Sequence, residues 1–258
     1  MFIDTHSHLF SEKFNNDRSE IIQRAKDNGV ERILLPNIDI DSIKSMHDLE
    51  DSDPDFFKSM MGIHPCSVSV NYEEELAITK KWFSKRDYCA IGEIGIDLYW
   101  EQDFIEQQKN AFRSQLKLAK ELKLPVAIHA RNSFNEIFKI VEEENDENLT
   151  GVFHCFTGGK EEAKKIMSFG GFKMGLGGVL TFKKAGLDKT AFEIPIEEFV
   201  LETDSPYFLP SQKNYSLSGV SHPGFVIFTA NHIASVKNIT VEDVIKANRR
   251  NVQEIYKI

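Results

Sequence analysis

The chain has 258 residues, a length that fits one barrel-sized domain with a large core or two smaller domains. Its composition of 41% hydrophobic and 28% charged residues is that of a globular protein and argues against extended disorder. The net charge of −9 argues against a broad basic face for nucleic acid, but it leaves open a local cleft in which bound metal cations supply positive charge.

Signals for a membrane or for secretion are missing from the sequence. No apolar run reaches the roughly 18 residues that a spanning helix needs. The segment Met1-Phe2-Ile3-Asp4 has neither the basic nor the apolar region of a secretory signal. The cysteines Cys66, Cys89 and Cys155 show no CxxC spacing. We therefore expect a reduced, cytoplasmic protein that does not contact a membrane.

Short apolar strands alternate with helical segments along the chain. Eight candidate strands begin near Phe2, Glu31, Phe57, Tyr88, Pro125, Gly151, Phe172 and Phe199. The clearest helix runs from Phe104 to Lys123, where apolar residues recur close to every 3.6 positions. Such alternation predicts parallel strands, and the count of eight favours a closed (β/α)₈ (TIM) barrel over an open sheet. We expect an α/β fold with one domain over residues 1–258. No glycine-rich nucleotide-binding motif opens any helix.

Near the chain start, His6-Ser7-His8 ends the first strand. Residues i and i+2 of a strand point to the same face, so both imidazoles can reach one point. Imidazole is a common ligand of divalent metals. Taken alone, this pair indicates a metal site only weakly.

Four further strands end in groups of the same chemical type. Glu93 follows an apolar run in the fourth strand, His129 ends the fifth, His154 ends the sixth, and Asp204 follows the eighth. Barrel enzymes build their active sites at this rim, where the carboxyl ends of the strands meet. The joint pattern therefore predicts a catalytic metal site rather than isolated core or capping residues.

Four imidazoles and two carboxylates suffice for two divalent cations if one carboxylate is shared. Glu93, in the middle of the order, is the expected bridge; His6, His8 and Asp204 would complete one site, and His129 with His154 the other. Such a pair lowers the pKa of bound water and spreads the negative charge of the transition state. Asp204 can then accept the proton of the water as a general base. The mixed nitrogen and oxygen ligands suit Zn²⁺, Mn²⁺, Ni²⁺ or, less well, Mg²⁺.

Other candidates lie beside these positions. Arg131, two residues after His129, is expected to face the site and grip a phosphate, and His64 at the end of the third strand is expected to contact substrate. Glu202 shares the expected inner face with Asp204 and is a candidate to support the ligands. Cys155 is expected to point away from the site and pack.

The motifs also resemble a known family. In chain order they are Phe2-Ile3-Asp4-Thr5-His6-Ser7-His8, Gly62-Ile63-His64-Pro65, Gly92-Glu93-Ile94-Gly95-Ile96-Asp97, Gln107-Gln108 with Phe112 and Gln115, Pro125-Val126-Ala127-Ile128-His129-Ala130-Arg131, Phe153-His154-Cys155-Phe156-Thr157-Gly158, Gly175-Leu176-Gly177-Gly178 and Leu201-Glu202-Thr203-Asp204-Ser205-Pro206-Tyr207. Together they are similar to the signatures of the TatD family of metal-dependent deoxyribonucleases, over essentially the whole chain.

The resemblance implies both a ligand set and an activity. The positions that match the family's metal ligands are His6, His8, Glu93, His129, His154 and Asp204. The family implies a divalent-metal-dependent deoxyribonuclease that trims single-stranded DNA from the 3′ end. DNA in a local cleft is therefore the expected partner, and we expect a monomer without a protein partner.

Three segments depart from the family pattern. Ser221 and His222 stand before Pro223 where an amide and a carboxylate are common, Cys66 stands where a second histidine is frequent, and Leu98 replaces an aromatic residue. His222 is expected to be an exposed loop residue. These departures touch substrate contacts rather than ligand positions.

Two other functions stay open. A related two-metal hydrolase of esters, lactones or aminoacyl esters would use the same ligand set, because activated hydroxide serves all of them. A non-catalytic barrel that only binds is disfavoured, because all six ligand types are present.

Overall fold

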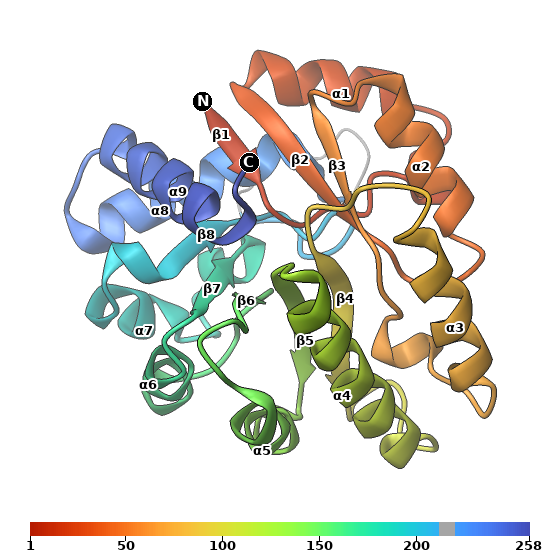
Figure 1. Ribbon diagram of the computed structural model, residues 1–258. Helices are drawn as coiled ribbons and strands as arrows, with labels where there is room; N and C mark the ends of the chain where they lie inside the picture. Colours follow the sequence, from red (N-terminus) through yellow and green to blue (C-terminus); the bar gives the residue numbers. More distant parts are fainter. Residues whose placement is uncertain (212–219) are drawn as a thin grey trace.

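The computed structural model describes residues 1–211 and 220–258, and its strands form a ring with helices outside it (Figure 1). The eight strands are β1 (Phe2–Asp4), β2 (Val30–Pro36), β3 (Phe57–Met60), β4 (Ile91–Asp97), β5 (Val126–Arg131), β6 (Gly151–Phe153), β7 (Phe172–Leu176) and β8 (Phe199–Leu201). Every ladder between them is parallel.

Helices connect the strands within the described residues. They are α1 (Arg18–Asp27), α2 (Ile43–Ser52), α3 (Tyr72–Trp82), α4 (Ile105–Leu122), α5 (Phe134–Glu144), α6 (Lys160–Ser168), α7 (Leu187–Glu193), α8 (Val226–Lys237) and α9 (Val241–Tyr256). Short 3₁₀ helices are η1 (Glu12–Phe14), η2 (Pro65–Ser67), η3 (Gly178–Thr181), η4 (Ile196–Glu198) and η5 (Pro223–Phe225). None of the described helices has the length and apolarity to cross a membrane.

Two predicted strand boundaries are wrong. The fourth strand begins at Ile91, not near Tyr88, because residues 88–90 form no continuous ladder with β3: they contribute an isolated bridge between Met60 and Ala90 and a hydrogen bond from the Cys89 N–H to the Ser59 carbonyl. The third strand ends at Met60, so His64 is not its last residue. His64 instead caps η2, and its Nδ1 accepts a hydrogen bond from the Cys66 N–H at 3.0 Å.

Two short seams close the barrel. The ladders join β1 to β3 in one group and β4 to β8 in another. The Met60–Ala90 bridge links β3 to β4, and a parallel bridge between Ser7 and Ser205 links the two ends of the ring. At this second seam the Thr5 N–H donates to the Leu201 carbonyl at 3.0 Å. The predicted (β/α)₈ barrel is therefore the observed fold.

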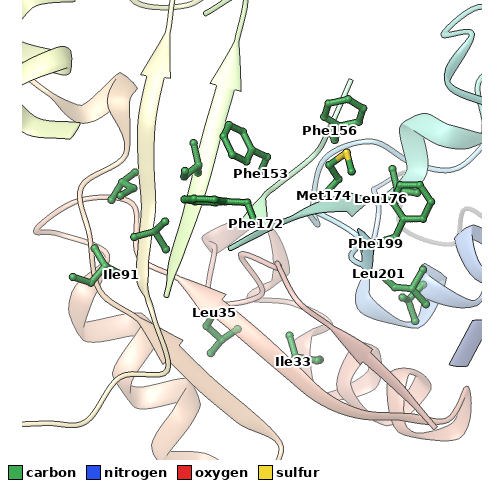
Figure 2. Close-up of a cluster of buried hydrophobic side chains, with 14 of the residues drawn as sticks. Ile33, Leu35, Ile91, Phe153, Phe156, Phe172, Met174, Leu176, Phe199 and Leu201 are labelled. Atoms are coloured by element: carbon green, nitrogen blue, oxygen red, sulfur yellow. The ribbon is translucent and has the colours of Figure 1, made fainter. Parts of the chain in front are cut away.

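An apolar layer inside the barrel, here called its floor, packs against the last helix, α9. One buried cluster gathers inward-facing residues from seven of the eight strand positions with the end of α9: Ile3, Leu34, Met60, Ala90, Ala127, Val152, Val200, Val252, Ile255 and Tyr256. The strand residues next to these point outward into a larger cluster under the helices. Figure 2 shows Ile33, Leu35 and Phe153 of this larger cluster, which are sequence neighbours of the floor residues Leu34 and Val152. This alternation follows from the two-residue period of a strand.

Asn248 of α9 ties the floor to the β1–β8 seam. Its Oδ1 accepts a hydrogen bond from the Leu201 N–H at 2.9 Å, and its Nδ2 donates to the Ile3 carbonyl at 3.1 Å. The side chain is 2% exposed, so water does not replace these bonds. It therefore fixes β1 against β8.

The substitution Asn248→Ala should destabilise the fold strongly, because it leaves the Leu201 N–H and the Ile3 carbonyl buried without this partner. Each such group costs about 1–3 kcal/mol of unfolding free energy. Thermal and urea denaturation followed by circular dichroism measure the loss. The matched control is Asn231→Ala on α8, whose exposed side chain bonds only to the Ile227 carbonyl. Equal melting temperatures for the two variants would contradict the proposed bond.

Candidate metal centre

A cavity of about 610 Å³ opens at the carboxyl ends of the strands. Six polar residues that line it belong to or follow five different strands: His8, His64, Glu93, Asp97, His129 and Asp204. The position follows from strand geometry, since His129 and His154 lie two residues beyond the floor residues Ala127 and Val152 and share their inward face. The apolar floor thus carries a polar layer directly above it.

Glu93 stands at the centre of this layer and is 1% exposed. Its Oε2 lies 3.1 Å from His6 Nε2 and 3.3 Å from His8 Nε2. Its Oε1 lies 2.9 Å from His129 Nδ1 and 2.6 Å from His154 Nε2. Each carboxylate oxygen therefore faces a different pair of imidazoles at 3.3 Å or less.

Asp204 approaches the same centre from the opposite strand. Its Oδ1 lies 3.6 Å from His8 Nε2 and 3.8 Å from His6 Nε2. The Asp204 N–H donates to the His6 carbonyl at 2.9 Å, which fixes the two segments across the seam. The carboxylate therefore lies on the His6–His8 side of Glu93.

Burial raises the pKa of both carboxyls, but the neighbouring imidazoles offset this effect to different degrees. Burial raises the pKa of Glu93, but the nearby imidazoles of His154, His64 and His6 lower it more, so its pKa lies well below the usual range. Burial raises the pKa of Asp204 to about 6, because His154 and His8 offset the loss of water only in part. Glu93 is therefore the fixed negative charge of the centre, and Asp204 is a group that titrates near neutral pH.

Asp97 joins the metal-ligand candidates to the loop after β4. Its Oδ2 lies 2.9 Å from His129 Nε2, and its Oδ1 accepts the N–H groups of Tyr99 at 2.8 Å and Trp100 at 2.7 Å. Burial lowers the pKa of His129, but Asp97 and Glu93 outweigh it and raise this pKa to about 9. A carboxylate on the far nitrogen of an imidazole is typical of metal sites, where it orients the ring.

Glu202 lies beside His154 and is fully buried. Its Oε1 accepts a hydrogen bond from the Cys155 N–H and lies 3.7 Å from His154 Nδ1. The space for this side chain comes from Gly175, because a Cβ there would stand 2.0 Å from Glu202 Oε2. The expected inner position of Glu202 therefore matches the structure.

The donor atoms fit a bound divalent cation. In each of three groups, the donor atoms lie within 4.8 Å of one another. The groups are His6, His8 and Glu93; His6, His154 and Glu202; and His64, Glu93 and His129. Among the described residues, His6 Nδ1, His8 Nδ1 and His154 Nδ1 are buried without a hydrogen-bond partner, so each of these rings has a nitrogen that no protein group occupies. Buried imidazoles grouped around carboxylate oxygens are a ligand set of Zn²⁺, Mn²⁺ or Ni²⁺.

The predicted substrate-contacting residues also reach the cavity. His64 Nε2 lies 3.4 Å from Glu93 Oε1, and the His64 ring packs against His129 with centroids 4.6 Å apart. Arg131 lines the wall, and its guanidinium lies over the Tyr99 ring at 5.0 Å. The structure thus brings all eight predicted site residues to one place.

Two side-chain expectations are wrong. Cys155 does not point away: it lines a cavity of about 30 Å³ with His129, His154 and Asp204, because its φ of 44° ends the alternation of β6. His222 is not exposed: it is 5% exposed and stacks on Phe225 with ring centroids 3.8 Å apart. Burial lowers the pKa of His222 to about 4. Neither Ser221 nor His222 lines the main cavity.

Asp97 and Trp100 are functional candidates to which the sequence alone gave no role. A signal for Asp97 exists, because Glu93, Gly95 and Asp97 point to the same face of one strand.

Helix α4 supports the backbone at two points of the site, at Asp97 and next to His64. Gln108 Oε1 accepts the Asp97 N–H at 2.9 Å, and Gln115 Oε1 accepts the N–H of Ile63, next to His64, at 2.9 Å.

The family model described as TatD related DNase matches residues 3–257. The chain belongs to the TatD family. The metal-dependent hydrolase YabD of Bacillus subtilis (strain 168), uncharacterized by its description, is 35% identical over 261 residues, which cover 100% of both chains. The 3′-5′ ssDNA/RNA exonuclease TatD of Pantoea vagans is 29% identical over 97% of both chains. The crystal structure of YjjV, a TatD homolog from Escherichia coli K12, matches with a TM-score of 0.90 at 24% identity, covering 100% of this chain and 98% of that one.

Membership in the TatD family confirms the resemblance inferred from the sequence motifs. It also makes the chain a metal-dependent hydrolytic enzyme, as predicted. The barrel is the fold of the solved TatD homolog, so the predicted fold class is confirmed as well.

Metal uptake should release protons, because the pKa of His129 is about 9 before a cation is bound. Below that pH the imidazole carries a proton that a cation must displace, so metal affinity should rise with pH up to about 9. Calorimetric titration with Zn²⁺ at pH 7.5, in buffers of different ionisation enthalpy, counts the protons released. His129→Ala should release fewer, whereas His232→Ala, which removes a histidine paired with Asp188 on the outside, should match the native protein. Uptake without proton release would contradict this ionisation state.

Proposed function

We propose that this TatD-family hydrolase is a two-metal deoxyribonuclease that removes nucleotides from the 3′ end of single-stranded DNA. The observation that carries the proposal is the position of Glu93, whose two oxygens each face a separate imidazole pair. That is the arrangement a shared ligand of two cations requires. The 3′-to-5′ direction and the single-stranded substrate are supported by the Pantoea vagans relative, because its name states both.

Each of the six candidate ligands has a place in this proposal. His6, His8 and Asp204 would hold one cation and His129 with His154 the other, with Glu93 shared between them. Bound there, divalent cations supply a water molecule of lowered pKa and positive charge opposite a phosphodiester. The candidate cations are Mg²⁺, Mn²⁺, Zn²⁺ and Ni²⁺.

Asp204 would take the proton of the attacking water. Its carboxylate lines the cavity, and burial places its pKa at about 6, near the range in which a general base works best at neutral pH. Glu93 remains charged throughout, because the imidazoles around it hold its pKa low. Glu93 would therefore hold a constant negative charge, and Asp204 would accept the proton.

Arg131 and His64 would contact the substrate. Arg131 carries the guanidinium on the cavity wall, where two N–H groups can bind one phosphate. His64 lies beside Glu93 at the rim of the same cavity and can orient the strand. The acidic net charge is compatible with this scheme, because the positive charge is needed only inside the cleft.

The proposal needs no second chain and no second domain. All six candidate ligands come from one barrel, so a monomer that folds as a single domain over residues 1–258 suffices. Cys66, Cys89 and Cys155 are free, which is compatible with the cytoplasmic location that we propose.

Asp204→Asn should lower DNA cleavage by about 10²- to 10⁴-fold, because the amide cannot accept the proton. Metal-stripped protein is reloaded with Mg²⁺, Mn²⁺, Zn²⁺ or Ni²⁺ and mixed with single-stranded DNA labelled at either end. Circular dichroism and metal content establish that the variant is folded and loaded. The matched control is Asp48→Asn, an exposed carboxylate that pairs only with Lys44 on α2.

Full activity of Asp204→Asn would refute the mechanism. A panel of esters, lactones and aminoacyl esters tests the related hydrolase in the same experiment. Turnover of those compounds alone would replace the nuclease, and no turnover of any substrate by folded, loaded protein would indicate a barrel that only binds.

A further inference from the structure

Exposed aromatic side chains gather at the mouth of the barrel. Among residues 1–211 and 220–258, the strongly exposed aromatic side chains are Tyr99, Trp100, Phe192 and Tyr207. Trp100 is 73% exposed and Tyr207 is 46% exposed, and both line the cavity that contains Glu93. Exposing rings of this size to water is unfavourable, so their place around the site calls for an occupant.

We propose that Trp100 and Tyr207 form a slot in which an unpaired nucleobase at the strand end is stacked. This inference rests on the proposed nuclease function and adds the feature of the substrate that is recognised. Trp100 follows β4 and Tyr207 follows β8. Four positions separate these strands in the closed ring of eight, so the two loops rise from opposite sides of the mouth. Rings on opposite walls of one cavity of about 610 Å³ leave room for a flat group between them.

The loop that carries Trp100 is held in place before any substrate binds. Asp97 Oδ1 accepts the backbone N–H groups of Tyr99 and Trp100. Gln102 Nε2 donates to the Leu98 carbonyl at 2.9 Å, and Gln108 Nε2 donates to the Glu101 carbonyl at 3.0 Å. Because Asp97 also bonds His129, the position of Trp100 is tied to the centre at which the phosphodiester would be cut. Such preorganisation reduces the entropy lost on binding.

Each wall also carries a cation held by an aromatic ring. Arg131 lies over Tyr99 at 5.0 Å on the Trp100 side, and Lys13 Nζ lies over the Tyr207 ring at 4.8 Å on the other. Neither side chain forms an ion pair with a carboxylate in the part of the chain that the structure describes. These cations match the phosphates on either side of a stacked base. Rings with cations beside them are the means by which proteins hold single strands without reading their sequence.

The geometry selects unpaired over paired bases. Inside a duplex both faces of a base are covered by stacked neighbours, and at a duplex end one face is still covered, so a paired base cannot be held between two rings. An unpaired terminal base offers both faces to the two walls. The slot would therefore recognise any base and would require that it be unpaired.

The test compares intact strands with strands whose 3′-terminal nucleotides are abasic. Trp100→Ala should raise the KM for an intact oligonucleotide by about 10- to 100-fold, the loss expected for one stacked base. The variant and the native protein should have the same KM for the abasic strand, because no base is left to stack. Tyr207→Ala should behave in the same way, and Trp100→Phe should restore most of the affinity. Phe192→Ala, which removes an exposed ring outside the cavity, is the matched control.

The outcomes separate the slot from the nuclease. If the native protein cleaves the intact strand and Trp100→Ala has the KM of Phe192→Ala, the slot is wrong and the nuclease stands. An equal rise in KM on intact and abasic strands would also refute stacking, because it would show that Trp100 only supports the loop. If the native protein cleaves neither strand with any metal, the nuclease itself fails.

Discussion

The buried carboxylate of Glu93 is the constraint on which the barrel mouth depends. A carboxylate at 1% exposure is unfavourable unless neighbouring groups offset the loss of water. Here four imidazoles from three strand ends supply that compensation within 2.6–3.3 Å. Because each oxygen faces its own pair, the strands must keep their relative positions to within a fraction of an ångström. The closed barrel is a scaffold that can hold such tolerances.

The scaffold achieves this by separating an apolar layer from a polar one. Floor residues such as Ala127, Val152 and Val200 pack on α9, and the inward positions two residues later carry His129, His154 and Glu202. The burial of Glu202 is unfavourable for a charged carboxylate, and it raises the pKa of this group well above the usual range. Gly175 leaves the space that this side chain occupies. The polar layer is thus supported from below as well as by its own contacts.

The sequence predicts the parts of this architecture that follow from strand periodicity. Apolar runs that end in His129, His154 and Asp204 place these groups at one rim, and the structure agrees. Periodicity says nothing about backbone that leaves the strand conformation. Cys155, with φ of 44°, therefore faces the site against expectation. His222 stacks on Phe225 three residues later, and the η5 segment that holds both rings packs against α1, where Asn28 donates a hydrogen bond to the Gly224 carbonyl. Asp97 could have been placed on the inner face, but its bonds to the Tyr99–Trp100 backbone depend on loop geometry that no local pattern encodes.

The net charge of the protein opposes the binding of a nucleic acid by the proposed nuclease, but the two effects act over different distances. The charge of −9 acts over the whole surface, but at physiological ionic strength it is screened beyond about 8 Å. Inside the cavity, the groups that would meet a strand in the proposed function are bound cations, Arg131 and the aromatic rings. Few phosphates would be contacted there, so ion pairing alone would contribute little affinity. Affinity must then come from contact-range interactions, and stacking on Trp100 and Tyr207 is the one for which the exposed surface is available. An acidic barrel can therefore act on a polyanion, provided that it engages only the strand end.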